Sequence, residues 1–165
     1  MENIKHLIEV LKSQVNLYSE LSELMDSEKQ AIVSWSIDKT LGITKKKDML
    51  MRKERIQSEA RNALLSKIAL EQKMLSVKIT DVIDILRTKQ DGEDAKMADE
   101  LASLCSRIVE LVKQVHAENI SLKMLYATNS RLINDFFTQT GLAGTAAGYG
   151  PNGSQNRVST IHRVG

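Results

Sequence analysis

The chain has 165 residues, of which 42% are hydrophobic but only 4% aromatic, with eight glycines and one proline. This length suits one domain, and the composition is typical of an all-α helical bundle with a core of Leu, Ile, Val and Met. The 23 Lys and Arg residues nearly balance 21 Asp and Glu residues, so the sequence shows no basic stripe for nucleic acid. The single cysteine, Cys105, excludes an intramolecular disulfide, and we expect it to be buried and inert.

The first 35 residues predict an amphipathic helix over residues 3–34. Its apolar side chains recur at helical spacing, whereas most charged residues fall off that face. Charged residues such as Lys5 and Glu9 also keep the apolar runs short. We therefore expect no signal peptide, no membrane insertion and a cytoplasmic location. Trp35 is expected to cover the end of the bundle at the first turn.

Residues 37–89 predict a second helix, because they contain no proline and only one glycine, Gly42. Ser34, Ser36 and Asp38 can accept hydrogen bonds from the free N–H groups at its start. The apolar pattern is weak between residues 52 and 62. Either this part is exposed to solvent or the helix bends, and the sequence leaves both possibilities open.

Residues 97–136 carry the strongest pattern, a third helix that follows a loop at residues 90–94. Apolar residues alternate at spacings of four and three, which places them in one stripe that must lie against another helix. The sequence thus predicts an elongated antiparallel helical bundle or coiled coil of three long helices. Two polar residues, Glu118 and Asn129, interrupt the stripe. We expect Asn129 to fix register and Glu118 to lie at a hydrated edge; the alternative is that another protein docks there.

The composition changes after Thr140. Six of the eight glycines and the only proline lie in residues 141–165, a composition typical of a flexible tail. We therefore divide the chain into a helical bundle at residues 1–140 and a flexible Gly-rich tail at residues 141–165.

Signatures of catalysis are missing from the sequence. It has no phosphate-binding GxxxxGKS, no GxGxxG after a strand, no HExxH and no CxxC. His6, His116 and His162 are scattered, and none follows a Glu by three residues as in di-iron bundles. The sequence therefore predicts no enzyme, no catalytic residues, no cofactor and no metal site, and it disfavours a phosphotransfer or metal-binding bundle.

Two regions of the sequence carry more specific motifs. Residues 28–61 contain Glu28, then Asp38-x-x-Leu41-x-x-Thr44-x-x-Lys47-x-x-Leu50, and Glu59-x-Arg61. Further on come Asn119, Asn129 and the run Tyr149-Gly150-Pro151-Asn152-Gly153. Together these residues resemble the FlgN family of flagellar type III export chaperones.

The resemblance implies a cytosolic chaperone for flagellar hook-associated proteins, which form the hook–filament junction. Such a chaperone binds the C-terminal helical region of its client, prevents premature assembly and delivers the client to the cytoplasmic domain of the export gate. It implies a monomer or weak dimer. The alternative is a structural or adaptor coiled-coil protein that self-associates or binds another long helix, because its apolar stripe would look the same.

Two sets of residues are candidate binding sites. Adjacent apolar residues at 132–133 and 136–137 make the stripe wider than one helix contact needs. We therefore expect the client to bind Leu122, Leu125, Asn129, Leu132, Ile133, Phe136 and Phe137. By analogy with the family, Tyr149 is a candidate contact for the export gate, with Tyr126 as its rival.

Overall fold

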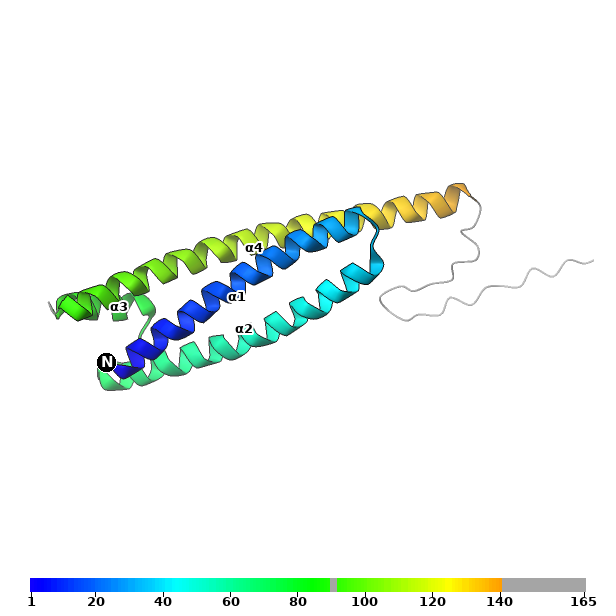
Figure 1. The fold of residues 1–165 in the computed structure, drawn as a ribbon. Coiled ribbons are helices and arrows are strands. Elements are labelled where there is room, and N and C mark those ends of the chain that lie inside the picture. The colour runs from blue at the N-terminus through cyan, green and yellow to red at the C-terminus, as the bar shows by residue number, and fades with distance from the viewer. Residues whose placement is uncertain (90–91, 141–165) are drawn as a thin grey trace, which may run out of the picture. The chain divides into compact units, whose positions relative to one another are not determined.

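A computed structural model describes residues 1–89 and 92–140, which form four α-helices and no strand (Figure 1). The helices are α1 (Glu2–Val33), α2 (Ile37–Glu71), α3 (Ile79–Thr88) and α4 (Gly92–Gln139). The all-α class is confirmed, but the expected count of three helices is wrong. The chain divides into two units, Met1–Leu125 and Tyr126–Gly165, so that α4 contributes to both. None of the described helices is long and apolar enough to cross a membrane.

The second predicted helix is interrupted at residues 72–78. Lys73 adopts a left-handed backbone conformation with a φ of 57°, and the N–H of Met74 donates to the carbonyl of Ala69 at 2.8 Å. This pairing ends α2 as a Schellman motif. The ten-residue α3 then begins where the carboxylate of Asp81 accepts a hydrogen bond from the N–H of Lys78 at 2.8 Å. A turn without glycine or proline thus interrupts the second half of the predicted helix.

In the first unit, α1 runs antiparallel to α2. Asn3, near the start of α1, donates to Glu71 at the end of α2. Further along α1, the hydroxyl of Tyr18 donates to the carboxylate of Glu54 at 3.0 Å. Because the α2 partner moves backward in sequence as α1 advances, the two helices form a hairpin.

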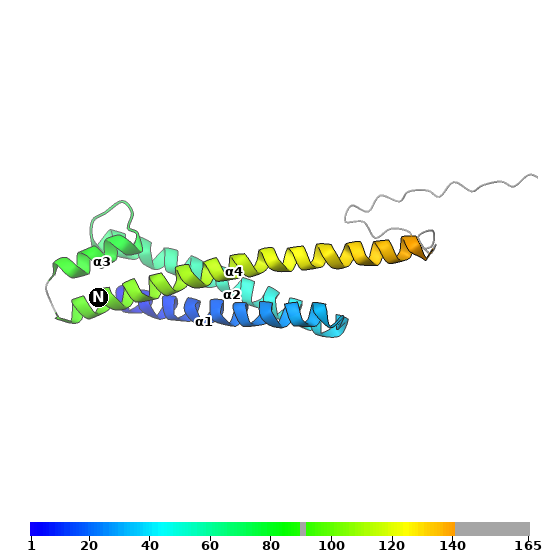
Figure 2. The same ribbon diagram turned by 90° about the horizontal axis from the view of Figure 1, so that it is seen from above.

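Along α4 the partners of α1 advance in the same direction. Lys5 pairs with Glu93 at 2.9 Å, and Lys12 pairs with Glu100 at 3.0 Å. These exposed ion pairs contribute little stability, but they show that α1 and α4 are parallel. Figures 1 and 2 show α1 alongside both α2 and the first part of α4.

Two apolar clusters form the core of the first unit. The larger joins all four helices and includes Leu7, Leu11, Ile68, Val82, Leu86 and Leu101, all at most 1% exposed. The smaller contains Leu17, Leu21, Met25, Ile32, Leu50 and Leu122. Each such side chain stabilises the fold by about 1.5–3 kcal/mol when fully buried, so these clusters hold α1, α2 and α4 together.

The weak apolar pattern at residues 52–62 corresponds to an α2 segment in which no residue is buried. This segment contacts α1 through polar side chains, as the hydrogen bond between Tyr18 and Glu54 shows. Apolar spacing therefore fades where the helix faces both solvent and a polar part of its neighbour.

Trp35 does not cover the end of the bundle as expected. It follows α1 in a left-handed conformation with a φ of 54°, and its side chain is 59% exposed. The N–H of Ser36 donates to the carbonyl of Ala31 at 2.9 Å, so that α1 ends in the same way as α2. The turn geometry, not packing of the indole, decides where Trp35 lies.

Candidate functional site

The predicted client-binding residues lie in different environments along α4. Leu122 is 2% exposed and belongs to the smaller apolar cluster, against which Leu125 is partly buried. These two residues stabilise the first unit, because their apolar groups already have partners on α1 and α2.

The remaining predicted residues lie in the second unit. Leu132, Ile133 and Phe136 are 55%, 41% and 60% exposed, while Asn129 and Phe137 are half-buried. The rings of Phe136 and Phe137 pack edge to face, with their centroids 5.9 Å apart. The helix thus presents several large apolar side chains to solvent within two turns. Such a patch is typical of a surface that binds another protein.

The candidate gate-binding tyrosines are placed differently. Tyr126 lies on α4, exposed and at the start of the second unit. Tyr149 lies outside the described residues. The structure therefore gives an environment for one of these two candidates.

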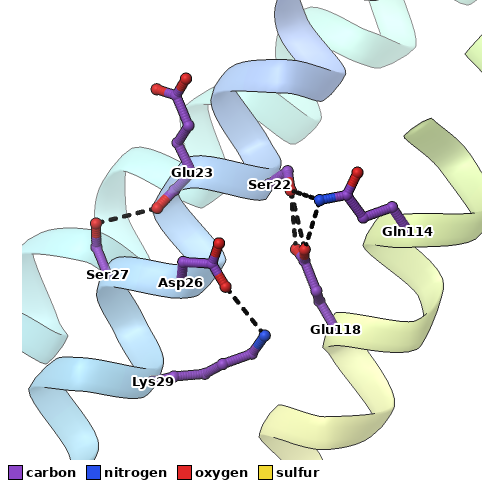
Figure 3. Close-up of polar contacts among 7 residues, drawn as sticks. All are labelled: Ser22, Glu23, Asp26, Ser27, Lys29, Gln114 and Glu118. Atoms are coloured by element: carbon purple, nitrogen blue, oxygen red, sulfur yellow. Dashed lines mark hydrogen bonds and ion pairs between the residues drawn. The ribbon is translucent and has the colours of Figure 1, made fainter. Parts of the chain in front are cut away.

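A buried polar network joins α1 to α4. Glu118 is only 9% exposed, and Ser22 Oγ lies 3.0 and 3.1 Å from its two carboxylate oxygens. Gln114 Nε2 donates to Ser22 Oγ at 2.8 Å and to Glu118 Oε1 at 2.9 Å (Figure 3). Our expectation that Glu118 lies at a hydrated edge is wrong. Its donors, one of them 96 residues away in sequence, compensate for the water that the carboxylate loses.

A second polar group separates the two apolar clusters where α1 faces α2. The side chain of Gln14 is fully buried and accepts a hydrogen bond from Arg61 at 3.3 Å. Tyr18 donates to Glu54, and burial, together with this hydrogen bond, raises the pKa of Tyr18 to about 12. Tyr18 therefore stays protonated, as a donor, across the physiological range.

The resemblance motif of the first two helices has a structural role in the hairpin. Glu28 of α1, whose side chain is 4% exposed, pairs with Lys47 of α2. Leu50, one turn further on, is buried in the smaller apolar cluster. These three residues were singled out from the sequence as separate motif positions. The structure brings them together, so they hold α1 against α2.

Reactive groups are sparse in the described chain. Cys105 is half-buried rather than fully buried, and burial raises the pKa of its thiol, which lowers the fraction of reactive thiolate. Across residues 1–89 and 92–140, no three His, Cys, Asp or Glu side chains gather as ligands for a metal ion. The arrangement is one of helix contacts and exposed apolar groups, which suits binding.

Comparison with known protein families gives a match. A family model described as FlgN protein matches residues 1–157, nearly the whole chain. No curated protein and no solved structure matches it. The matched range includes all four helices and Tyr149.

Proposed function

Because this chain belongs to the FlgN family of flagellar export chaperones, we propose that it escorts hook-associated proteins in the cytoplasm. It binds the C-terminal helical region of the client, prevents premature assembly and delivers the client to the cytoplasmic domain of the type III export gate. The family match over residues 1–157 carries this proposal. No nucleic acid, membrane insertion, cofactor or catalytic residue takes part.

The exposed apolar residues of α4 support a client site there. Leu132, Ile133 and Phe136 lie within five residues of one another and have most or much of their surface in solvent. An amphipathic client helix can cover such a surface by laying its own apolar face on it. The same contact hides from solvent the client residues that would otherwise drive assembly.

The client site is tested by the double variant Leu132→Asp, Ile133→Asp. Calorimetric titration with the purified C-terminal region of a hook-associated protein should show at least a tenfold loss of affinity, about 1.4 kcal/mol. Circular dichroism should show unchanged helicity, because both side chains are exposed. Preserved affinity in the folded variant would contradict this placement.

The matched control is Val109→Asp, Val112→Asp. These residues lie on the same helix and are 52% and 41% exposed, close to the 55% and 41% of the tested pair. The control should bind the client normally. An equal loss in both variants would mean that added negative charge, not the apolar surface at 132–133, weakens binding.

We assign delivery to the gate to Tyr149, with Tyr126 as the alternative contact. Tyr149→Ala in the full chain should weaken binding to the purified cytoplasmic domain of the gate and leave client affinity unchanged. Tyr126→Ala is the parallel variant, and a selective loss there would move the assignment to α4. If neither variant changes gate binding, neither tyrosine contacts the gate.

We also propose that residues 1–140 hold the fold while residues 141–165 serve delivery. The C-terminal segment has six glycines, whose ordering carries a large entropic cost. Deleting it should change the melting temperature by no more than about 2 °C and leave client binding measurable. A large loss of thermal stability would show that this segment is part of the fold.

The oligomeric state separates an escort from a scaffold. A chaperone of this kind should sediment as a monomer or weak dimer and become more stable when one client helix binds. An obligate oligomer with no client affinity would instead support a structural or adaptor coiled coil, because the exposed residues of α4 would then be covered by copies of the same chain.

A further inference from the structure

A groove runs between α1 and α2 near the turn that joins them. It consists of two hollows, of about 610 and 390 Å³, which share Ser27 and Lys46 as lining residues. Its floor is formed by four apolar side chains that are buried or half-buried, namely Leu24, Ala31, Ile43 and Leu50. The groove therefore offers an apolar floor with polar edges, the arrangement that accepts an amphipathic helix.

One edge of the groove is a row of three lysines on α2. Lys39, Lys46 and Lys53 line it and follow one another every seven residues, about 10.5 Å apart along the helix. All three are exposed. Among the described residues none of them has an ion-pair or hydrogen-bond partner, whereas the neighbouring Lys47 is paired with Glu28. This edge thus presents unpaired positive charge at the spacing of two helical turns.

The opposite edge, formed by α1 and by Ser34 directly after it, restricts the kind of ligand. Glu20 and Glu23 line the half of the groove that contains Lys53, while uncharged Gln30 and Ser34 line the half that contains Lys39. The two carboxylates would repel nucleic acid or an anionic membrane surface. A helix with acidic residues on one flank and basic or neutral residues on the other matches both edges.

Gly42 provides a second observation at the same place. It lines the groove between Lys39 and Lys46, and a Cβ atom added there would meet nothing within 4 Å. A glycine inside a helix costs about 1 kcal/mol relative to alanine, yet no close contact within the described chain requires it. Its missing side chain leaves room for another backbone to approach α2 closely.

We propose that this groove binds one amphipathic helix of a partner protein, whose acidic residues recur every seven positions and face Lys39, Lys46 and Lys53. The C-terminal segment of the same chain does not fit, because residues 141–165 contain two arginines and no acidic residue. The proposed site uses only α1 and α2, so it can be tested independently of the client site on α4.

The test uses a synthetic peptide of three heptads with Leu at the core positions and Glu along one flank, labelled for fluorescence anisotropy. The full-length protein should bind it. The triple variant Lys39→Glu, Lys46→Glu, Lys53→Glu should bind the Glu peptide at least tenfold more weakly. A peptide with Lys in place of Glu should instead bind the triple variant more tightly than the original protein. No binding of the Glu peptide, or equal binding to the triple variant, overturns the proposal.

The matched control is Lys45→Glu, Arg52→Glu, Arg55→Glu. It changes the net charge by the same amount on the same helix, but none of its residues lines the groove. It should bind the Glu peptide nearly as well as the original chain. A tenfold loss here as well would show attraction to overall charge rather than to the groove, and would overturn the proposal.

A second variant, Gly42→Leu, fills the groove without changing charge. Because the free structure has open space at this position and leucine favours helix, the melting temperature should stay the same or rise while peptide binding falls at least tenfold. Unchanged binding overturns the proposal. So does concentration-dependent self-association that the triple variant abolishes, because the occupant would then be a second copy of this chain.

Discussion

Ser22 of α1 and Glu118 of α4 meet inside the first unit, with Ser22 Oγ 3.0 and 3.1 Å from the two carboxylate oxygens. Gln114 supplies a second donor to the same carboxylate. A carboxylate that is 9% exposed needs such donors, because it has lost most of its water. The pair therefore sets how α1 and α4 are aligned along their length, since a shift of either helix would separate donor from acceptor.

Ser22→Ala should destabilise the protein. It leaves the buried carboxylate of Glu118 with one donor fewer, which costs about 1–3 kcal/mol. Urea unfolding followed by circular dichroism measures the change. Ser27→Ala is the control, because Ser27 is exposed and its hydroxyl donates only to the carbonyl of Glu23 in its own helix. Equal effects of the two substitutions would show that the network does not stabilise the fold.

Tyr18 should titrate at a higher pH than an ordinary tyrosine. Its pKa is raised to about 12, first by burial and then by the hydrogen bond to Glu54. Absorbance of the native protein at alkaline pH should therefore show a late step that Tyr18→Phe removes. Glu54→Gln should bring that step closer to pH 10, because one of its two main causes is then lost.

The same shift has a consequence for stability. The pKa of Tyr18 is higher in the folded chain than its ordinary value of 10.0, so its contribution is fully present below pH 10 and is lost as pH rises toward 12. The free energy of unfolding, measured between pH 9 and 12, should therefore decrease less steeply with pH for Tyr18→Phe than for the original chain. Identical pH dependence in the two proteins would contradict the shift.

Lys73→Gly should stabilise the turn between α2 and α3. Lys73 has a φ of 57°, a conformation that costs a non-glycine residue about 1–2 kcal/mol. Glycine removes that strain but adds conformational freedom to the unfolded chain. We therefore expect the free energy of unfolding to rise by about 0.5–1 kcal/mol. Thermal unfolding measures it. Lys67→Gly, inside α2, should instead lower stability, and a loss at both positions would refute the strain.

Lys47→Met should destabilise the hairpin of α1 and α2. It removes the cation next to Glu28, whose side chain is 4% exposed. Breaking a buried ion pair costs about 3–5 kcal/mol, and we expect roughly 2–3 kcal/mol here because water reaches Lys47. Lys45→Met, two residues earlier and exposed, should have little effect. Chemical denaturation of both variants makes the comparison.

The long helices were predictable because their cause is local. The alternation of four and three that begins at Met97 marks one apolar face of a helix, and α4 indeed runs over Gly92–Gln139. The break after Glu71 was not predictable in this way. It depends on Lys73 adopting a conformation that its own preferences disfavour, and the hydrogen bond that closes the turn gives no sequence signal.

The candidate sites also combine features that the sequence shows with features that it does not. The sequence marked Glu118 as an interruption of the apolar stripe, but not its donor, because Ser22 lies 96 residues away. The seven-residue spacing of Lys39, Lys46 and Lys53 is visible in the sequence. The sequence does not show which side of α2 is covered by α1. The groove could therefore be identified only from the structure.

The parallel pairing of α1 with α4 has a consequence for how the chain is made. Leu7 and Leu11 are buried in a cluster that needs Leu101, which is synthesised about 90 residues later. At roughly 5–20 residues per second, the ribosome takes roughly 5–20 s to provide it. During that interval α1 has left the ribosome, but part of its apolar face still lacks its contact with α4. The nascent chain should therefore itself be a substrate for ribosome-associated chaperones.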